Sequence, residues 1–345
     1  MGVWYATREQ VKAAMDTAET ARNDSAVDRA IESASRSAEG LLHRRFYPLV
    51  ATRYFDWPNR QYARPWRLWL DDQELVSVTT LTAGGTVVPS SDYFLEPVNT
   101  GPPYNRVEID LSSTAAFSAG DTRQRAIQID GTWYLEDDTA AGALAEALDD
   151  SETGVDVTNS FLVGVGSIIK VDSERMIVTG KAMLDTGETC YALTASSSDE
   201  SITGVTAGTV ATGETIKVDS ERMLVVDQAS TTLTVKRAWD GSTLATHDAG
   251  TAIFAPRTLQ VERGALGTTA ATHTDATSIS VHVVPALVRD LVVAEAIDQL
   301  QQETSAYARV IGEGDNAREG TGRGLADLRR DAVRVHGRKA RARAV

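Results

Sequence analysis

The sequence predicts an α+β protein: a helical core, made of N- and C-terminal helices with a small β-unit, and an inserted all-β domain containing two similar nested units. Helical spacing of apolar residues at both ends of the 345-residue chain predicts the helices. Between the ends, strand-like runs alternate with turn residues, and the octapeptide IKVDSERM occurs twice. We therefore expect helices and the small β-unit in 1–139, the inserted all-β domain in 140–284, and helices with a basic arm in 285–345.

The N-terminal part predicts two helices followed by strands. Thr7 and Gln10 have the spacing of a capping box, so a short helix is expected through Ala14. A second helix is expected after Asp24, and it ends before Pro48 because the residue preceding proline disfavours helix. Its apolar stripe is rich in alanine, which permits close packing of another helix, and comprises Val27, Ala30, Ile31, Ala34, Ala38, Leu41 and Leu42.

The octapeptide begins at Ile169 and again at Ile216. In each copy, strand-like residues flank Asp-Ser-Glu, a sequence that favours a turn, so a β-hairpin is predicted twice. A second echo follows both hairpins: RAWDGSTLATHDAGTAI from Arg237 and RGALGTTAATHTDATSI from Arg263. This order predicts that one unit, about 210–254, is inserted into another that starts near 161 and resumes near 259. Two intertwined halves are the alternative.

The segments on either side of these repeats differ in texture. Residues 140–156 are acidic and alanine-rich, which predicts a short helix or a linker. After Pro285, apolar residues recur with helical spacing as far as Leu300. Glycines between 312 and 324 predict a flexible break, and a basic arm follows that is expected to be helical over 325–335.

Composition and charge limit the classes of function. No apolar run approaches the length of a membrane span, and the N-terminus lacks the features of a signal peptide, so manufacture in the cytoplasm is expected. The single Cys190 excludes an internal disulfide and a cysteine metal cluster. The net charge of −14 argues against nonspecific DNA binding over the whole surface. Basic residues gather after Arg323, which indicates either an arm with its own partner or a solvated tail.

No motif calls for catalysis, a metal or a cofactor. Asp172, Ser173 and Glu174 are interpreted as a turn because the same trio recurs in the second hairpin. His247 and His273 are related by the repeat and lack a metal-ligand spacing, so we expect each to close a loop by a hydrogen bond. The glycine-rich stretch lacks the GK[ST] ending of a phosphate loop. We therefore predict a protein without catalytic residues, metal ligands or cofactors.

The opening TREQVKAAMDTAETARNDSAVDRAIESASRSAEGLLHRRFYP resembles the N-terminal helices of the head-to-tail connector (adaptor) proteins of tailed phages. The shared features are a short capped helix and a long alanine-rich helix that ends in an aromatic-Pro step. The closing VPALVRDLVVAEAIDQLQQETSAYARVIGEG is similar to their later helices, and RGALGTTAATH is similar to repeats of phage structural proteins. The resemblance covers residues 5–54 and 285–345, whereas the β insert departs from the minimal family pattern.

The resemblance implies a structural protein of the virion neck that forms a ring, usually a dodecamer, beneath the portal. DNA would pass through the lumen without sequence-specific binding. The other neighbours would be a tail-side neck or tail terminator protein and, through the insert, the major capsid protein. Subunits would pack through Val27, Ala30, Ile31, Ala34 and Ala38. The portal-binding arm would comprise Arg329, Arg330, Arg334, Arg338, Lys339, Arg341 and Arg343.

Two other classes of function stay open. The first is a virion decoration or host-glycan-binding module carried by the β insert, whose only aromatic residues are Phe161, Tyr191, Trp239 and Phe254. The second is an enzyme such as a glycoside hydrolase, which would use paired carboxylates. Acidic residues are plentiful, but none stands in a recognisable catalytic motif.

Overall fold

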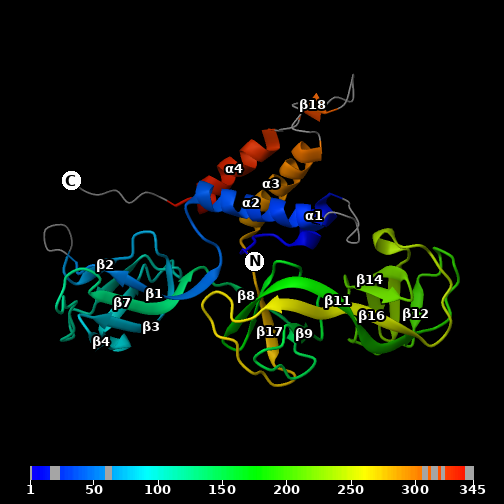
Figure 1. Ribbon diagram of the computed structural model, residues 1–345, viewed down its shortest axis with the longest axis horizontal. Coiled ribbons are helices and arrows are strands. Elements are labelled where there is room, and N and C mark those ends of the chain that lie inside the picture. Colours follow the sequence, from blue (N-terminus) through cyan, green and yellow to red (C-terminus); the bar gives the residue numbers. More distant parts are fainter. Residues whose placement is uncertain are drawn as a thin grey trace. The chain divides into compact units, whose positions relative to one another are not determined.

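The computed structural model describes residues 2–15, 24–58, 64–304, 310–311, 318–319 and 323–338 (Figure 1). The chain divides into two compact bodies. The larger body contains Met1–Leu42, Asp138–Ala265 and Thr269–Gly337, and the smaller body contains His43–Asp137, Leu266–Thr268 and Arg338–Val345.

The predicted α+β class with a helical core is wrong. Strands make up 38% of the described residues and helices 21%, and the sheets are antiparallel. Two buried clusters of the larger body, of 14 and 12 residues, consist of residues from strands and the loops between them. The helical spacing at the chain ends does produce helices there, but these helices do not form the main core. The stretch 140–156 also differs from its prediction, because it contains two strands instead of a helix or linker.

Four helices of the larger body pack together: α1 (Arg8–Ala14), α2 (Asp24–Leu42), α3 (Ala286–Thr304) and α4 (Arg323–His336). The predicted capping box is confirmed, since Thr7 and Gln10 each accept a hydrogen bond from the other's backbone N–H. The stripe of α2 is buried as its spacing predicts, except for Leu41, which is half-buried. None of the helices within the described residues is long and apolar enough to cross a membrane.

The main sheet of the larger body is antiparallel and has the order β12-β15-β14-β13-β16-β11-β10-β17-β8, with β9 also paired to β16. The strands are β8 (Asp138–Ala143), β9 (Gly154–Asp156), β10 (Ile168–Val171), β11 (Glu174–Cys190), β12 (Ser201–Thr203), β13 (Thr215–Val218), β14 (Glu221–Ala229), β15 (Thr232–Lys236), β16 (Thr251–Glu262) and β17 (Ser278–His282). A short 3-10 turn, η2 (Trp239–Gly241), follows β15, and β18 (Val310–Ile311) pairs with β19 (Arg318–Glu319) elsewhere in the body.

Both predicted hairpins are confirmed. Val171 pairs with Glu174 in one hairpin, and Val218 pairs with Glu221 in the other. The first turn residue, Asp172 or Asp219, has φ of 51° in each case. This left-handed conformation is one that aspartate tolerates better than most residues, which explains why the repeat keeps it there.

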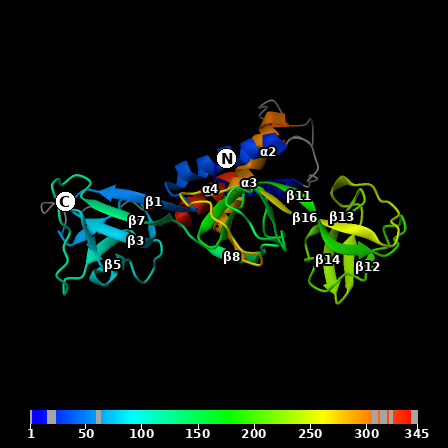
Figure 2. The ribbon, with the colours of Figure 1, turned by 60° about the horizontal axis from the view of Figure 1, so that its bottom comes forward.

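The two longest strands, β11 and β16, lie side by side and connect two similar β-units (Figures 1 and 2). The outer repeat consists of β8, β9, β10, β17, the first part of β11 and the last part of β16. The inner repeat consists of β12, β13, β14, β15, the last part of β11 and the first part of β16. Each repeat has its own apolar core, the outer one around Ile169 and Met176 and the inner one around Ile216 and Met223.

The smaller body is built from two antiparallel sheets. One has the order β1-β7-β3-β4 and the other β2-β6-β5. Their strands are β1 (Pro48–Phe55), β2 (Arg67–Trp69), β3 (Leu75–Ala83), β4 (Thr86–Val88), β5 (Tyr93–Glu96), β6 (Arg106–Ile109) and β7 (Ile127–Tyr134), with a 3-10 turn η1 (Ser90–Asp92) before β5.

Candidate functional site

The inner repeat holds a buried cluster of ionisable side chains. Glu221 begins β14, and Arg237 directly follows β15. The Arg237 guanidinium donates from Nε and Nη2 to the Glu221 carboxylate at 2.8 and 2.9 Å, and both side chains are almost fully buried. Glu221 also accepts from Nε2 of His247 at 2.9 Å, while Nδ1 of His247 lies 2.7 Å from the turn residue Asp219.

The outer repeat contains the same cluster with the same atoms. Arg263 donates from Nε and Nη2 to Glu174 at 2.8 and 2.9 Å. Nε2 of His273 lies 3.0 Å from Glu174, and its Nδ1 lies 2.8 Å from Asp172. In each repeat the glutamate also accepts two backbone N–H bonds, and the arginine donates to carbonyl oxygens of neighbouring loops.

These contacts set the charge of the two glutamates. Burial alone would raise the pKa of Glu221, but hydrogen bonds from Arg237, His247 and two backbone amides outweigh it and lower the pKa to about 2. Glu174 is governed by the same opposing causes, and its pKa is also about 2. Both carboxylates are therefore ionised at neutral pH and surrounded by donors.

Each cluster is suited to holding the strands and loops of its own repeat together and is unsuited to catalysis. Glu174 and Glu221 have fully buried side chains whose oxygens already accept several hydrogen bonds, which leaves no access for a substrate. Within the described residues, no group of three or more His, Cys, Asp and Glu could hold a metal ion. The expectation that each histidine closes a loop is confirmed, because His247 and His273 form isolated bridges with Leu193 and Leu148.

Sequence reasoning missed these clusters in part. It interpreted Glu174 and its counterpart Glu221 as turn residues, whereas the turn consists of the two preceding positions and the glutamate is the buried acceptor. A signal was present in the sequence. The octapeptide contains the glutamate, and both copies of the second echo begin with arginine and contain Ala-Thr-His. The repetition shows that each glutamate recurs together with an arginine, but it does not show that the two side chains are partners.

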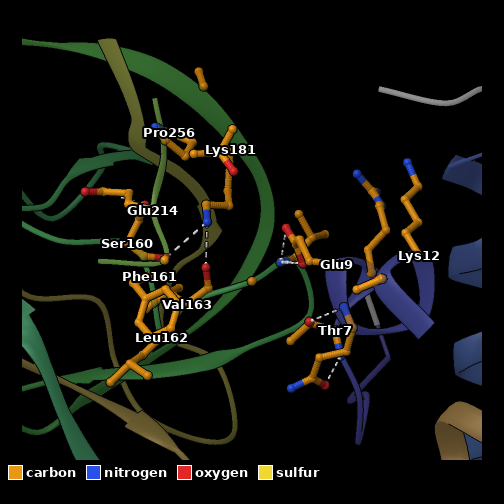
Figure 3. Close-up of a pocket in the computed structure, with 18 of the residues that line it drawn as sticks. Thr7, Glu9, Lys12, Ser160, Phe161, Leu162, Val163, Lys181, Glu214 and Pro256 are labelled. Carbon is orange, nitrogen blue, oxygen red and sulfur yellow. Dashed lines mark hydrogen bonds between the residues drawn. The ribbon is translucent and has the colours of Figure 1, made fainter. Parts of the chain in front are cut away.

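A pocket of about 590 Å³ lies where α1 meets both repeats (Figure 3). The Glu9 carboxylate accepts from the backbone N–H of Val165 at 2.9 and 3.1 Å, and this contact holds α1 on the outer repeat. The ammonium group of Lys181 points to the carbonyl oxygens of Ser160 and Val163, at 3.2 and 2.7 Å, and fixes the loop that forms one wall.

Many of the charged side chains around this pocket form ion pairs. Lys12 is almost fully buried and pairs with Asp24. Arg8 makes a bidentate contact with Asp28 at 2.6 and 2.7 Å. Glu214, on the inner repeat, is buried against Arg257. The pocket therefore lies where α1 and the two repeats come together, and its lining contains no recognisable catalytic arrangement.

The predicted portal-binding residues differ in their exposure and in their contacts. On α4, Arg329 donates to Glu295 of α3 at 2.7 Å, so it helps to attach the two helices. Arg330 and Arg334 expose 72% and 75% of their side chains and pair with Asp327 and Asp331 of their own helix. Arg338 is half-buried. Lys339, Arg341 and Arg343 lie outside the described residues.

The predicted subunit-packing stripe lies inside the chain. Its members are buried, with exposures between 0% and 7%, and the helix that carries them packs against α1, α3 and α4. This burial places them in contacts of the chain with itself, so the stripe offers no free face to a neighbouring subunit in this structure. The residues concerned are Val27, Ala30, Ile31, Ala34 and Ala38.

Comparisons of the chain with protein-family models, curated proteins and solved structures find no match.

Proposed function

We propose that the chain is a structural head-to-tail adaptor of a tailed bacteriophage, forming a ring beneath the portal through which DNA passes during packaging and ejection. One observation carries this proposal: helices from the two ends of the chain, which are the segments that resemble connector proteins, pack together as one group. The long β-rich interior separates them in sequence but not in space. The proposal therefore assigns the assembly contacts to the ends and treats the β repeats as an addition.

The buried clusters support a structural role over an enzymatic one. Their two glutamates, Glu174 and Glu221, are buried and accept several hydrogen bonds each, and the charges around the pocket are largely paired. The glycan-binding alternative receives less support, because the rings of two exposed aromatics, Phe161 and Tyr191, lie over Gly213 and Gly204. Both rings already pack against the backbone of the inner repeat.

The partners that follow from this proposal are other copies of the chain, the portal, and a tail-side neck or tail terminator protein. The exposed arginines of α4, Arg330 and Arg334, are the described residues of the arm that are best placed to meet a portal. The virion neck is the corresponding location.

The test is negative-stain electron microscopy of the purified chain, alone and mixed with portal rings. Closed rings with a central hole, or an added layer on the portal, are expected. Monomers that never join a portal would refute the proposal. The double charge reversal Arg330→Glu with Arg334→Glu should abolish attachment, whereas Arg289→Glu on α3 is the control and should not.

A further inference from the structure

The two repeats correspond residue by residue. Equivalent positions in the hairpins, such as Ile169 and Ile216, lie 47 positions apart. Equivalent positions in the later strands, such as Arg237 and Arg263, lie 26 positions apart. Under these two shifts β10 corresponds to β13, the start of β11 to β14, and the end of β16 to β15.

The strand pairing follows this correspondence closely. In the inner repeat, β14 and β15 pair from Leu224 with Lys236 to Ala229 with Thr232. In the outer repeat, the equivalent segments of β11 and β16 pair from Ile177 with Glu262 to Ala182 with Thr258. Even the irregularity is shared, because the register shifts after Val225 in one ladder and after the equivalent Val178 in the other.

The ladders differ at one place only, their closed end. In the inner repeat, Ala229 and Thr232 are joined by the two-residue turn Ser230-Thr231. In the outer repeat, the equivalent pair, Ala182 and Thr258, is joined by residues 183–257, which form the inner repeat itself. The inner repeat therefore occupies the position of a two-residue hairpin turn.

Contacts around this position are conserved between the repeats. The backbone N–H of Val157 donates to the Arg257 carbonyl at 3.0 Å, next to the outer pair. At the equivalent place in the inner repeat, Val205 donates to the carbonyl of the turn residue Thr231 at 3.1 Å. A simple turn would thus supply the carbonyl oxygen that Arg257 now supplies.

Residues 183–257 also pair their own charges. Arg237 with Glu221, Arg257 with Glu214 and Arg222 with Asp240 are all internal to this segment. Removing it takes both members of each pair away together, so none of these pairs leaves a buried charge behind. The inner apolar core also lies wholly between residues 190 and 253.

An aromatic ring packs against each repeat at an equivalent glycine. Gly166 and Gly213 have φ of 99° and 89°. A Cβ on Gly166 would lie 2.4 Å from the Trp4 ring, and one on Gly213 would lie 2.2 Å from the ring of Phe161. Each repeat therefore receives an aromatic side chain from the segment that precedes it. Phe161 is the second residue of the turn that the bond from Val163 N–H to the Ser160 carbonyl closes. The equivalent turn of the inner repeat is closed by Thr209 and Thr206, and its second residue is Ala207, which has no ring.

We propose that residues 183–257 are a self-contained folding module inserted at a hairpin turn of the outer repeat, and that Ser230-Thr231 is the equivalent acceptor turn in the inner repeat. Phe161 packing on Gly213 fixes the module against its host. The series of repeats ends at the inner one because Ala207, which takes the place of Phe161, provides no ring for a further repeat. This inference goes beyond the proposed function and does not depend on it.

The first experiment removes the module from the full chain by joining Ala182 to Thr258 through Ser-Thr, which copies the inner turn. The shortened protein should remain folded, with amides of β10 and β17 as protected from hydrogen exchange as in the parent chain. The matched control removes one residue more, 183–258, and uses the same Ser-Thr linker. Across this two-residue turn Ala182 would pair with Leu259, one position away from its native partner. This slip turns the side chains of the later strand to the opposite face, so the control should lose that protection.

The second experiment extends the array by replacing Ser230-Thr231 with an additional copy of residues 183–257. A folded, soluble product with the added copy protected from exchange is expected when Ala207 is also changed to Phe. Loss of protection in the outer repeat after the correct excision would overturn the proposal of a module. Failure of the extended chain to fold would overturn the assignment of Ser230-Thr231 as the acceptor turn. Equal protection of the β10 and β17 amides in the two shortened proteins would overturn the strand register on which the excision is based.

Discussion

Glu221→Gln is the substitution that best tests the role given to the buried clusters. It preserves the side-chain volume but removes the charge that Arg237 faces in a fully buried position. It also replaces one oxygen by an amide donor. One carboxylate oxygen accepts from Nε of Arg237 and from Ala238, and the other accepts from Nη2 of Arg237, Ala245 and His247. Either orientation of the glutamine therefore turns an NH2 group towards donors.

The magnitude follows from two independent arguments. Removing one partner of a buried ion pair costs about 3–5 kcal/mol, because the remaining charge is left without compensation. The pKa of Glu221 is lowered from 4.5 to about 2. At about 1.4 kcal/mol per pKa unit, this corresponds to about 3 kcal/mol of preferential stabilisation of the ionised form. We therefore expect a loss of about 3 kcal/mol from the inner repeat.

Amide hydrogen exchange measured for individual residues is the appropriate assay, since a chain with several cores need not unfold in one step. Protection of β13 and β14 amides should fall by at least about 100-fold, while β10 and β17 change little. Glu174→Gln should produce the converse pattern. Asp331→Asn, which breaks an exposed pair on α4, is the control and should cost less than about 1 kcal/mol. A change below about 1 kcal/mol for Glu221→Gln would refute the reasoning.

Three further outcomes are expected. The folded-state pKa values of Glu174 and Glu221 are both lowered to about 2, so the stability that their ionised forms contribute is complete above about pH 4.5 and is lost as the pH falls towards 2. Urea titrations should therefore show a much lower unfolding midpoint at pH 3 than at pH 7. Equal midpoints at the two pH values would contradict this expectation. Gly213→Val should lower the melting temperature more than Gly208→Val, since both glycines have positive φ but only the first contacts a ring; equal losses would show that backbone strain alone is responsible. Glu9→Ala should cost about 1–2 kcal/mol and make α1 more susceptible to limited proteolysis, because a backbone amide of the outer repeat loses its acceptor; unchanged cleavage would rule out this role.

Local features of the fold could be predicted from the sequence because they depend on neighbours in the chain. The capping box at Thr7 requires only a residue three positions away, and the octapeptide encodes its hairpin through strand residues around a tolerant aspartate. The nested order was visible for a similar reason, since the echoes preserve the order of elements whatever their distance in space.

The fold class could not be derived in that way. Helical periodicity at the ends identifies helices correctly but says nothing about which elements form the main core. Residues 140–156 show the difficulty: their alanine and acidic content favours helix, yet β8 pairs with β17 and β9 with β16. Pairing with distant strands overrides local propensity there. The burial of Glu174 was missed for the same reason, because its partner Arg263 lies 89 positions away.

Two similar repeats that share an identical octapeptide could exchange partners during folding, and sequence separation opposes this. Glu221 and Arg237 are 16 positions apart, whereas Glu174 and Arg263 are 89 apart. The entropy of loop closure favours the shorter closure by about 1.5 kcal/mol. The inner cluster should therefore form first, and its completion brings β11 and β16 together so that the outer cluster closes over a much shorter effective loop.

The crossed pairs, Glu174 with Arg237 and Glu221 with Arg263, span 63 and 42 positions, so each is disfavoured relative to the inner pair. Pulse-labelled hydrogen exchange during refolding tests this order. Amides of β13 and β14 should gain protection before those of β10 and β17, and Glu221→Gln should delay both sets because the outer repeat then has to close its full loop. Earlier protection of β10 and β17 would show that the outer repeat folds without help from the inner one. In that case, something other than sequence separation must keep the two copies of the octapeptide from exchanging partners.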